Sequence, residues 1–218
     1  MPFRIGEIIG LDVDLAFLIA SSMGVKVGIE VMPFDELLQA LKAGKVDMVI
    51  SGMTITPERN LEVAFVGPYF ITGKGILTTT ANVGRLQDIS SINQPNVTVV
   101  ALRGSTSQQF VNQWLPEARF ISFKNLDSAV NALLLGDADA LIADFHYCAV
   151  TAFQYKDRGI AAGAARFTYE PLGIALPTND PLLVNWVTNF LVTLQGSGDL
   201  KFFTERWFTD SSWLERLP

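Results

Sequence analysis

The stretch SGMTITPER combines hydroxyl and glycine residues at the end of an apolar run with an arginine, Arg59, at the start of a predicted helix. Thr56 can cap that helix, and Pro57 suits its first position, where a missing N–H is tolerated. Arg59 then falls in the first turn, where the positive end of the helix dipole disfavours a cation. Either Arg59 points into water, or it converges with the Ser51 and Thr54 hydroxyl groups and the N–H groups of the turn on an anion.

The composition limits the kinds of partner. The chain has 218 residues, 49% of them hydrophobic, which is enough to bury the core of one large or two small domains. Lys and Arg number 16 against 22 Asp and Glu, a net charge of -6 with no basic cluster, so we expect neither nucleic acid nor an anionic membrane as a partner. No apolar run approaches the ~18 to 20 residues of a membrane span. A small ligand fits these properties best.

Strands and helices alternate along the chain. Residues 25–31 and 46–50 are predicted strands, and residues 34–44 between them are a predicted helix that ends at Gly44. The pattern recurs 92 residues later in ARFISFKNLDSAVNALLLGDADALIAD, which predicts two similar α/β lobes with parallel sheets. Six positions are identical at that offset: Asp35 and Asp127, Ala40 and Ala132, Leu41 and Leu133, Gly44 and Gly136, Asp47 and Asp139, Ile50 and Ile142.

The repeat also predicts where ligand-binding residues lie. The strand that ends at Ile50 is followed by Ser51 and Gly52, whereas its counterpart, which ends at Ile142, is followed shortly by Asp144. Ligands of open parallel sheets lie beyond the carboxyl ends of the strands. The first lobe therefore offers hydroxyl groups and an arginine, and the second offers a carboxylate. These opposite charges suit the two ends of a zwitterion.

A third loop, RGSTSQQF, follows another predicted strand and contains Gly104 and Thr106. Two interpretations are open: an ordinary Ser/Thr helix cap, or a glycine turn whose N–H groups bind a carboxylate. The loop lacks the lysine and glycine spacing of a nucleotide P-loop and the second glycine of a nucleophile elbow. Neither of those two motifs is predicted.

These motifs resemble the polar amino-acid periplasmic binding proteins, the family 3 solute receptors of ABC importers. The resemblance rests on GMTIT followed by Arg59, on RGSTSQQF, LGDADALIAD and PLGIALPTND, and on the closing RWF, and it covers nearly the full chain. It implies a type II periplasmic binding fold of two α/β lobes that close on the ligand by hinge motion. We expect lobe one at residues 1–73 and 173–218, lobe two at 74–172, and crossing strands near Pro68–Gly73 and Thr168–Leu172.

The resemblance also implies roles for residues of the first lobe. Arg59 matches the arginine that clamps the ligand α-carboxylate, where a planar fork makes two parallel bonds. Thr54 matches a second residue that binds that carboxylate. The backbone at Ser51 or Gly52 matches the group that binds the α-ammonium.

Three further residues complete the implied site. Thr106 matches a carboxylate donor of the second lobe, and Asp144 matches the acid that holds the α-ammonium. Phe34 matches an apolar wall against the ligand side chain, although a core residue before a helix is an equal interpretation.

The N-terminus departs from the family pattern. Family members usually begin with a strand of the form LRVGT, whereas here Met1 directly precedes Pro2 and Phe3. Residues Ile5–Ile9 either replace that strand or correspond to the family's loop in a sequence that starts late, and we favour the second. The N-terminus also lacks the layout of a signal peptide, so the signal segment is expected to be absent from this sequence.

Enzyme functions find little support in the sequence. The one histidine, His146, and the one cysteine, Cys148, stand two residues apart, a spacing that rarely forms a Cys–His pair or a metal site. An alternative is a cyclohexadienyl dehydratase-like enzyme, which uses a pocket glutamate as its acid, but the corresponding turn, DFHYC, offers Tyr147 and no glutamate. A second alternative is the ligand-sensing domain of a receptor.

We therefore expect a non-enzymatic receptor without metal or cofactor. Its expected partners are an amino acid, whose side chain the sequence does not identify, and the membrane permease of an ABC importer. We expect a monomer without direct membrane insertion, located in the periplasm or lipid-anchored outside the cytoplasm.

Overall fold

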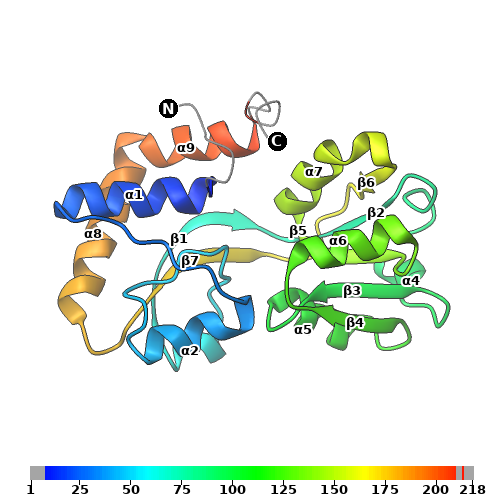
Figure 1. The fold of residues 1–218 in the computed structure, drawn as a ribbon, viewed down its shortest axis with the longest axis horizontal. Helices are drawn as coiled ribbons and strands as arrows, with labels where there is room; N and C mark the ends of the chain where they lie inside the picture. Colours follow the sequence, from blue (N-terminus) through cyan, green and yellow to red (C-terminus); the bar gives the residue numbers. More distant parts are fainter. Residues whose placement is uncertain (1–7, 210–212, 214–218) are drawn as a thin grey trace. The chain divides into compact units, whose positions relative to one another are not determined.

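The computed structural model describes residues 8–209 and residue 213, so Ile5–Glu7 of the Ile5–Ile9 segment lie outside the described residues. The chain forms two compact units and passes between them at Ile71–Thr72 and at Glu170–Pro171, as well as on either side of the short segment Pro33–Asp35 (Figure 1). The first unit contains the described residues up to Met32, residues 36–71 and those from Pro171 onward. The second contains Thr72–Glu170 together with the short segment Pro33–Asp35.

The first unit is mainly helical. Its longest helices, α1 and α8, pack with α9 around a core that includes Leu15, Val187 and Trp207. The indole Nε1 of Trp207 also donates a hydrogen bond to Asp14 Oδ2 of α1 at 2.8 Å. The elements are α1 (Leu11–Met23), α2 (Leu37–Lys42), α3 (Pro57–Asn60), β1 (Ala64–Thr72), β7 (Glu170–Leu176), α8 (Pro181–Ser197) and α9 (Asp199–Phe208). The 3₁₀ turn η1 (Phe34–Glu36) is shared, because Phe34 and Asp35 belong to the second unit and Glu36 to the first.

The strands β1 and β7 carry the crossings at Ile71–Thr72 and at Glu170–Pro171. They pair with each other in a two-stranded sheet, and their ends Thr72 and Glu170 belong to the second unit. Gly173 of β7 is confined, because a Cβ there would lie 2.6 Å from a side-chain carbon of Ile55.

Two predicted strands of the first unit are wrong. Residues 25–31 form no ladder, and residues 46–50 contribute only one isolated antiparallel bridge, between Val49 and Ala175 of β7. A strand needs a neighbour to satisfy its N–H and C=O groups, and none of the described strands lies beside residues 25–31. Val31 is accordingly 78% exposed. The predicted parallel βαβ unit is thus replaced by a helix and an extended chain that touches β7 antiparallel.

The second unit is built on a five-stranded sheet with the order β4-β3-β5-β2-β6. Strands β3, β4 and β5 are parallel, whereas β2 runs antiparallel to both of its neighbours. Its elements are β2 (Lys74–Thr79), α4 (Ile89–Ile92), β3 (Thr98–Leu102), α5 (Thr106–Trp114), β4 (Arg119–Phe123), α6 (Leu126–Leu135), β5 (Ala140–Asp144), α7 (Phe145–Gln154), the 3₁₀ turn η2 (Lys156–Arg158) and β6 (Ile160–Ala162).

The predicted βαβ pattern of this unit is confirmed. Strand β4, helix α6 and strand β5 follow each other as expected, and Gly136 ends α6 in the left-handed conformation with φ 80°. Alternate residues of β3 face opposite sides of the sheet, so Val99 packs with α5 and Val100 packs with α6. Helices on opposite faces create a switch point between β3 and β5, and the loops beyond these two strands are where a ligand is expected.

None of the helices within residues 8–209 is both long and apolar enough to cross a membrane.

Candidate ligand-binding site

The turn around Arg59 forms as the sequence predicted. Thr56 is the N-cap of α3, and its Oγ1 accepts a hydrogen bond from the Arg59 N–H at 3.2 Å. Pro57 occupies the first helical position, where no hydrogen bond is lost. The helix is only four residues long, so Arg59 stays close to the preceding strand-like segment.

The guanidinium group of Arg59 is anchored to that segment. Its Nη1 donates a hydrogen bond to the carbonyl oxygen of Thr54 at 2.8 Å. Thr54 is 5% exposed and is itself bridged to Leu172 of β7, so the anchor is part of the first unit's framework. The structure thus brings Arg59 and Thr54 together, whereas the Ser51 residue is exposed at the turn.

The Gly52 turn is held by two residues that the sequence analysis missed. Asp12 Oδ2 accepts a hydrogen bond from the Gly52 N–H at 2.8 Å, and Asp12 Oδ1 accepts one from the Tyr69 hydroxyl at 2.8 Å. Gly52 has φ 56°, a left-handed conformation that favours glycine. An aspartate in the first turn of α1 indicates only a favourable helix-dipole interaction, so no local motif predicts this contact.

In the second unit, the loop after β3 contains a true helix cap. Ser105 is the N-cap of α5: its Oγ accepts from the Gln108 N–H at 3.3 Å and donates to the Leu102 carbonyl at 2.7 Å. Gly104 has φ 73°, and a Cβ on it would lie 2.8 Å from the Asp35 Cβ. The loop therefore needs glycine at this position, and the cap interpretation is correct for Ser105.

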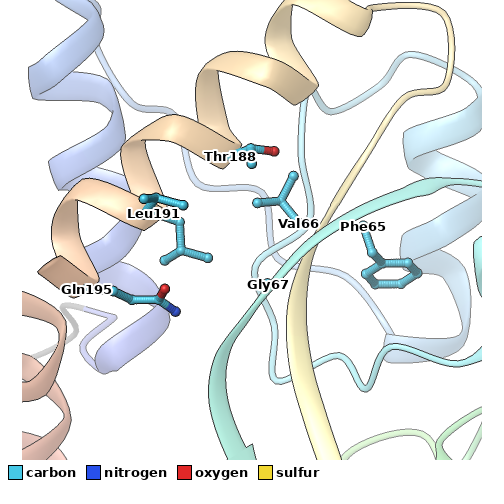
Figure 2. A pocket seen from close by; sticks show the side chains of 7 residues that line it. Phe65, Val66, Gly67, Thr188, Leu191 and Gln195 are labelled. Atoms are coloured by element: carbon cyan, nitrogen blue, oxygen red, sulfur yellow. The ribbon is translucent and has the colours of Figure 1, made fainter.

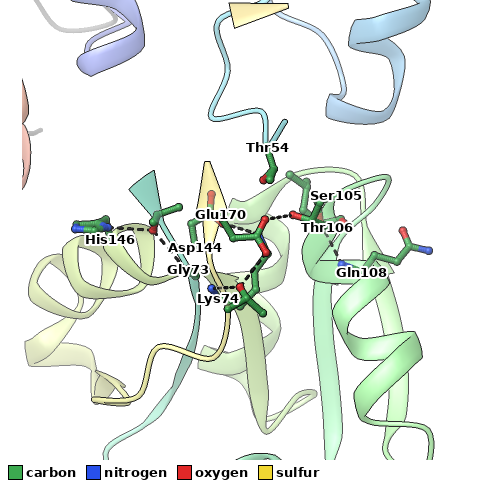
Figure 3. Close-up of polar contacts among 12 residues, drawn as sticks. Thr54, Gly73, Lys74, Ser105, Thr106, Gln108, Asp144, His146 and Glu170 are labelled. Atoms are coloured by element: carbon green, nitrogen blue, oxygen red, sulfur yellow. Dashed lines mark hydrogen bonds and ion pairs between the residues drawn. The ribbon is translucent and has the colours of Figure 1, made fainter. Parts of the chain in front are cut away.

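Thr106 uses its hydroxyl within the protein. The Oγ1 donates a hydrogen bond to Glu170 Oε2 at 3.0 Å, while Glu170 Oε1 accepts one from Thr168 Oγ1 at 2.9 Å (Figure 3). Glu170 is only 7% exposed. Its part in this cluster was not predicted, because the sequence places it far from Thr106.

Asp144 lies at the end of β5, as expected, and is paired with a lysine that was not expected. Its Oδ1 lies 2.6 Å from Lys74 Nζ, and the same Nζ lies 3.5 Å from Glu170 Oε2 (Figure 3). The Lys74 side chain is 2% exposed and that of Asp144 is 25% exposed. A lysine at the head of an otherwise apolar strand, KGILTT, was the one available signal.

Phe34 begins the 3₁₀ turn η1 and is partly buried in the segment that packs with the second unit. The candidate residues therefore divide into two groups. Ser51, Gly52, Thr54 and Arg59 belong to the first unit, and Phe34, Thr106 and Asp144 belong to the second.

The first turns of α7 hold the residues considered for catalysis. His146 Nδ1 lies 3.0 Å from Thr72 Oγ1, and burial followed by the charge of Arg166 lowers the pKa of His146, while Asp144 opposes the shift. Burial also raises the pKa of the Cys148 thiol and of the Tyr147 hydroxyl. Cys148 is fully buried, so its thiol is neither exposed nor activated as a nucleophile.

A hollow of about 160 Å³ lies in the first unit between β1 and α8 (Figure 2). No charged side chain lines it, so it offers no charged partner for either end of an amino acid. It is lined by Phe65, Val66, Gly67, Thr188, Leu191, Val192 and Gln195.

Comparison with known proteins gives consistent results. The profile of the bacterial extracellular solute-binding proteins, family 3, matches residues 2–210. The ABC transporter glutamine-binding protein GlnH of Bacillus subtilis (strain 168) is 28% identical over 208 residues, which cover 94% of this chain and 74% of that protein.

Two solved structures are similar over their length. A putative binding component of an ABC transporter from Wolinella succinogenes DSM 1740, complexed with lysine, has 33% identity and a TM-score of 0.90 over 99% of this chain and 92% of that chain. The ancestral amino acid-binding protein AncCDT-1, a precursor of cyclohexadienyl dehydratase, has 36% identity and a TM-score of 0.86 over 95% of this chain and 89% of that chain. The fold is that of the type II periplasmic binding proteins, and the chain belongs to family 3 of the bacterial extracellular solute-binding proteins.

Proposed function

We propose that this protein is an extracytoplasmic receptor that binds an α-amino acid with residues from both units and delivers it to the permease of an ABC importer. The observation that carries the proposal is the division of charge: an anchored guanidinium, Arg59, in one unit and a carboxylate, Asp144, in the other. Arg59 and Thr54 bind the α-carboxylate, and Asp144 binds the α-ammonium.

The remaining candidate residues have supporting roles in this proposal. The backbone at Ser51 or Gly52 contacts the ammonium through carbonyl oxygens, because an ammonium only donates hydrogen bonds; the Gly52 N–H is bonded to Asp12. The hydroxyl of Thr106 donates to Glu170, so its backbone N–H at the start of α5 is the donor to the carboxylate. Phe34 forms a wall against the ligand side chain.

The functional lobes we propose span residues 1–73 with 173–218, and residues 74–172. The receptor acts as a monomer in the periplasm or as a lipid-anchored protein outside the cytoplasm. The names of related proteins support this function, since glutamine and lysine occur as their ligands.

A thermal-shift screen with each of the twenty L-amino acids tests the proposal. A ligand at 100 times its Kd stabilises the folded state by roughly 2.7 kcal/mol, so a true ligand raises Tm measurably. At least one amino acid is expected to do so. No shift with any of the twenty would contradict an amino-acid receptor.

The second candidate is a cyclohexadienyl dehydratase-like enzyme, which the similarity to a precursor of that enzyme brings into consideration. We propose that the chain is not this enzyme. The turn Asp144–Cys148 carries no glutamate, and the nearby Glu170 already accepts hydrogen bonds on both carboxylate oxygens. Incubation with a cyclohexadienyl carboxylate is expected to give no aromatic product by ultraviolet absorbance, and catalytic turnover would reverse this choice.

A further inference from the structure

Lys74 is a buried cation placed by strand register directly opposite Asp144. The two residues are Cα partners in the antiparallel pairing of β2 with β5, so their side chains share one face of the sheet. Lys74 Nζ lies 2.6 Å from Asp144 Oδ1. A lysine that is 2% exposed needs such a partner, because a buried unpaired ammonium is strongly unfavourable.

The side chain of Asp144 does not take the contact that its position favours. Asp144 is the N-cap of α7, where an aspartate usually accepts a hydrogen bond from an N–H of the first helical turn. Here the side chain makes no capping hydrogen bond and is directed to Lys74 instead. The ion pair therefore decides which way this carboxylate points.

Glu170 completes the cluster on the other side of Lys74. Its Oε2 lies 3.5 Å from Lys74 Nζ, and the hydroxyls of Thr106 and Thr168 donate to its two oxygens. The Lys74 N–H also donates to Thr168 Oγ1 at 2.9 Å, which ties the strand to this cluster. Both carboxylate oxygens of Glu170 are thus held by hydrogen bonds that do not involve Asp144.

The cluster carries two carboxylates and one ammonium, so its formal charge is -1. Lys74 and Glu170 are 2% and 9% exposed in their side chains, whereas Asp144 is 25% exposed. Asp144 is therefore the solvent-accessible end of the row Glu170, Lys74, Asp144. A second cation placed at that end would continue the alternation of charges and balance the cluster.

We propose that Lys74 is a positioning residue for the ammonium site: it holds the Asp144 carboxylate away from the α7 cap and presents it to the ligand's α-ammonium. This inference rests on the proposed function. Because Glu170 and Asp144 both interact with the single ammonium of Lys74, the cluster keeps a net charge of -1 that attracts the ligand's ammonium.

A charge-matched variant separates positioning from net charge. Lys74→Met leaves two carboxylates without a cation, Glu170→Gln leaves a neutral Lys74–Asp144 pair, and the double variant Lys74→Met/Glu170→Gln restores -1 without the Lys74 contact. Replacing charges by side chains of similar volume is often tolerated in protein interiors, so the double variant is expected to fold.

Calorimetric titration measures the Kd of each variant for L-arginine, L-lysine and L-glutamine. Competition titration measures the Kd for the matching des-amino analogues, which are 5-guanidinopentanoate, 6-aminohexanoate and 4-carbamoylbutanoate. We expect the double variant to lose about tenfold or more in affinity for the amino acid, and about twofold or less for the matching analogue. An amino acid affinity equal to that of the wild type would show that net charge alone matters and would overturn the positioning role. Equal losses for both ligand classes would also overturn it, since they indicate a general structural effect.

A ligand-free arm separates failure of this inference from failure of the proposed function. Tm is measured for Lys74→Met, Asp144→Asn and the variant with both changes. Because the two side chains form one ion pair, the loss in the variant with both changes is expected to be smaller than the sum of the single losses. Additive losses would mean that Lys74 does not hold Asp144, whatever the ligand is. If the losses are coupled but no amino acid binds the wild type, the proposed function fails while the ion pair stands.

Discussion

Arg59 Nη1 donates a hydrogen bond to the carbonyl oxygen of Thr54, and the two residues lie in the same short turn. A guanidinium group has five N–H donors in a rigid plane, so this bond restricts the orientation of the whole fork. Lysine has no such plane and would carry only a point charge to this position. The turn thus orients a group suited to a planar anion.

Arg59→Lys is expected to keep the fold and weaken amino-acid binding. Hydrogen bonds to charged groups contribute about 1.5 to 3 kcal/mol, which corresponds to a roughly 10- to 150-fold rise in Kd. Calorimetric titration with the ligand found by thermal shift checks this value. Arg119→Lys, at an exposed position of β4, is the matched control. A Kd within about twofold of the wild type would show that Arg59 points into solvent and does not bind the ligand.

Asp144→Asn is expected to act selectively on ligands with an amino group. Removal of one partner from a buried ion pair costs about 3 to 5 kcal/mol, so Kd for the amino acid should rise roughly 100-fold or more. The des-amino analogue should lose much less, because its contact with Arg59 remains, and the Lys74–Glu170 pair limits damage to the fold. Asp137→Asn, exposed just before β5, serves as control. Equal losses for the two ligands would place the effect on the fold.

Ligand binding is expected to draw the two units together. The proposed binding residues are divided between the units, and β1 and β7 connect the units at Ile71–Thr72 and Glu170–Pro171, where a hinge can bend. Small-angle scattering should show a smaller radius of gyration at saturating ligand. Arg59→Lys at the same ligand concentration should show a smaller fraction of this change. An unchanged radius at proven saturation would exclude closure.

Gly73→Ala is expected to destabilise the second unit. A Cβ at this position would clash with the Thr168 carbonyl oxygen and with Arg166 Cγ, and the backbone oxygen has little room to move. Overpacking of this kind costs about 1 to 3 kcal/mol or more, which lowers Tm by several degrees in a chain of this length. Gly84→Ala is the control, since nothing lies within 4 Å of its Cβ position. Identical Tm values for the two variants would refute the close approach.

The titration of His146 is expected to make stability depend on pH. Burial, with the charge of Arg166, lowers the pKa of His146 below its ordinary value of 6.5. On acidification the unfolded chain therefore binds a proton near pH 6.5, before the folded state does, so stability falls as pH drops through 6.5 towards the folded pKa. Tm measured between about pH 7.5 and about pH 5.5 should fall less in His146→Gln than in the wild type. Parallel curves would show that His146 does not contribute.

The sequence was sufficient where local rules decide the structure. The Thr56 cap with Pro57 in the first turn, the strand–helix–strand order before Asp144, and the family all followed from residues close together in the chain. A cap or a helix end depends on neighbours within a few positions, which spacing reveals directly.

The sequence was insufficient where a partner lies far along the chain. Residues 25–31 have the composition of a strand, but a strand depends on its neighbour, and composition does not show whether one is present. The contact of Lys74 with Asp144 depends on the register between β2 and β5, and the contact of Asp12 with Gly52 depends on the packing of α1. Neither register nor packing is visible in a local motif.

The segments near the two ends of the stretch Thr72–Glu170 are hydrogen-bonded to each other. The Phe167 N–H donates to the Lys74 carbonyl at 2.8 Å, so the places where the chain enters and leaves this unit are neighbours. A short linker can therefore join the two ends of residues 72–170. New chain ends can then be made at an exposed turn, such as the one at Gly84. Such a circular permutation moves the covalent hinge without disturbing the sheet, and it offers a site for inserting a fluorescent reporter of amino-acid binding.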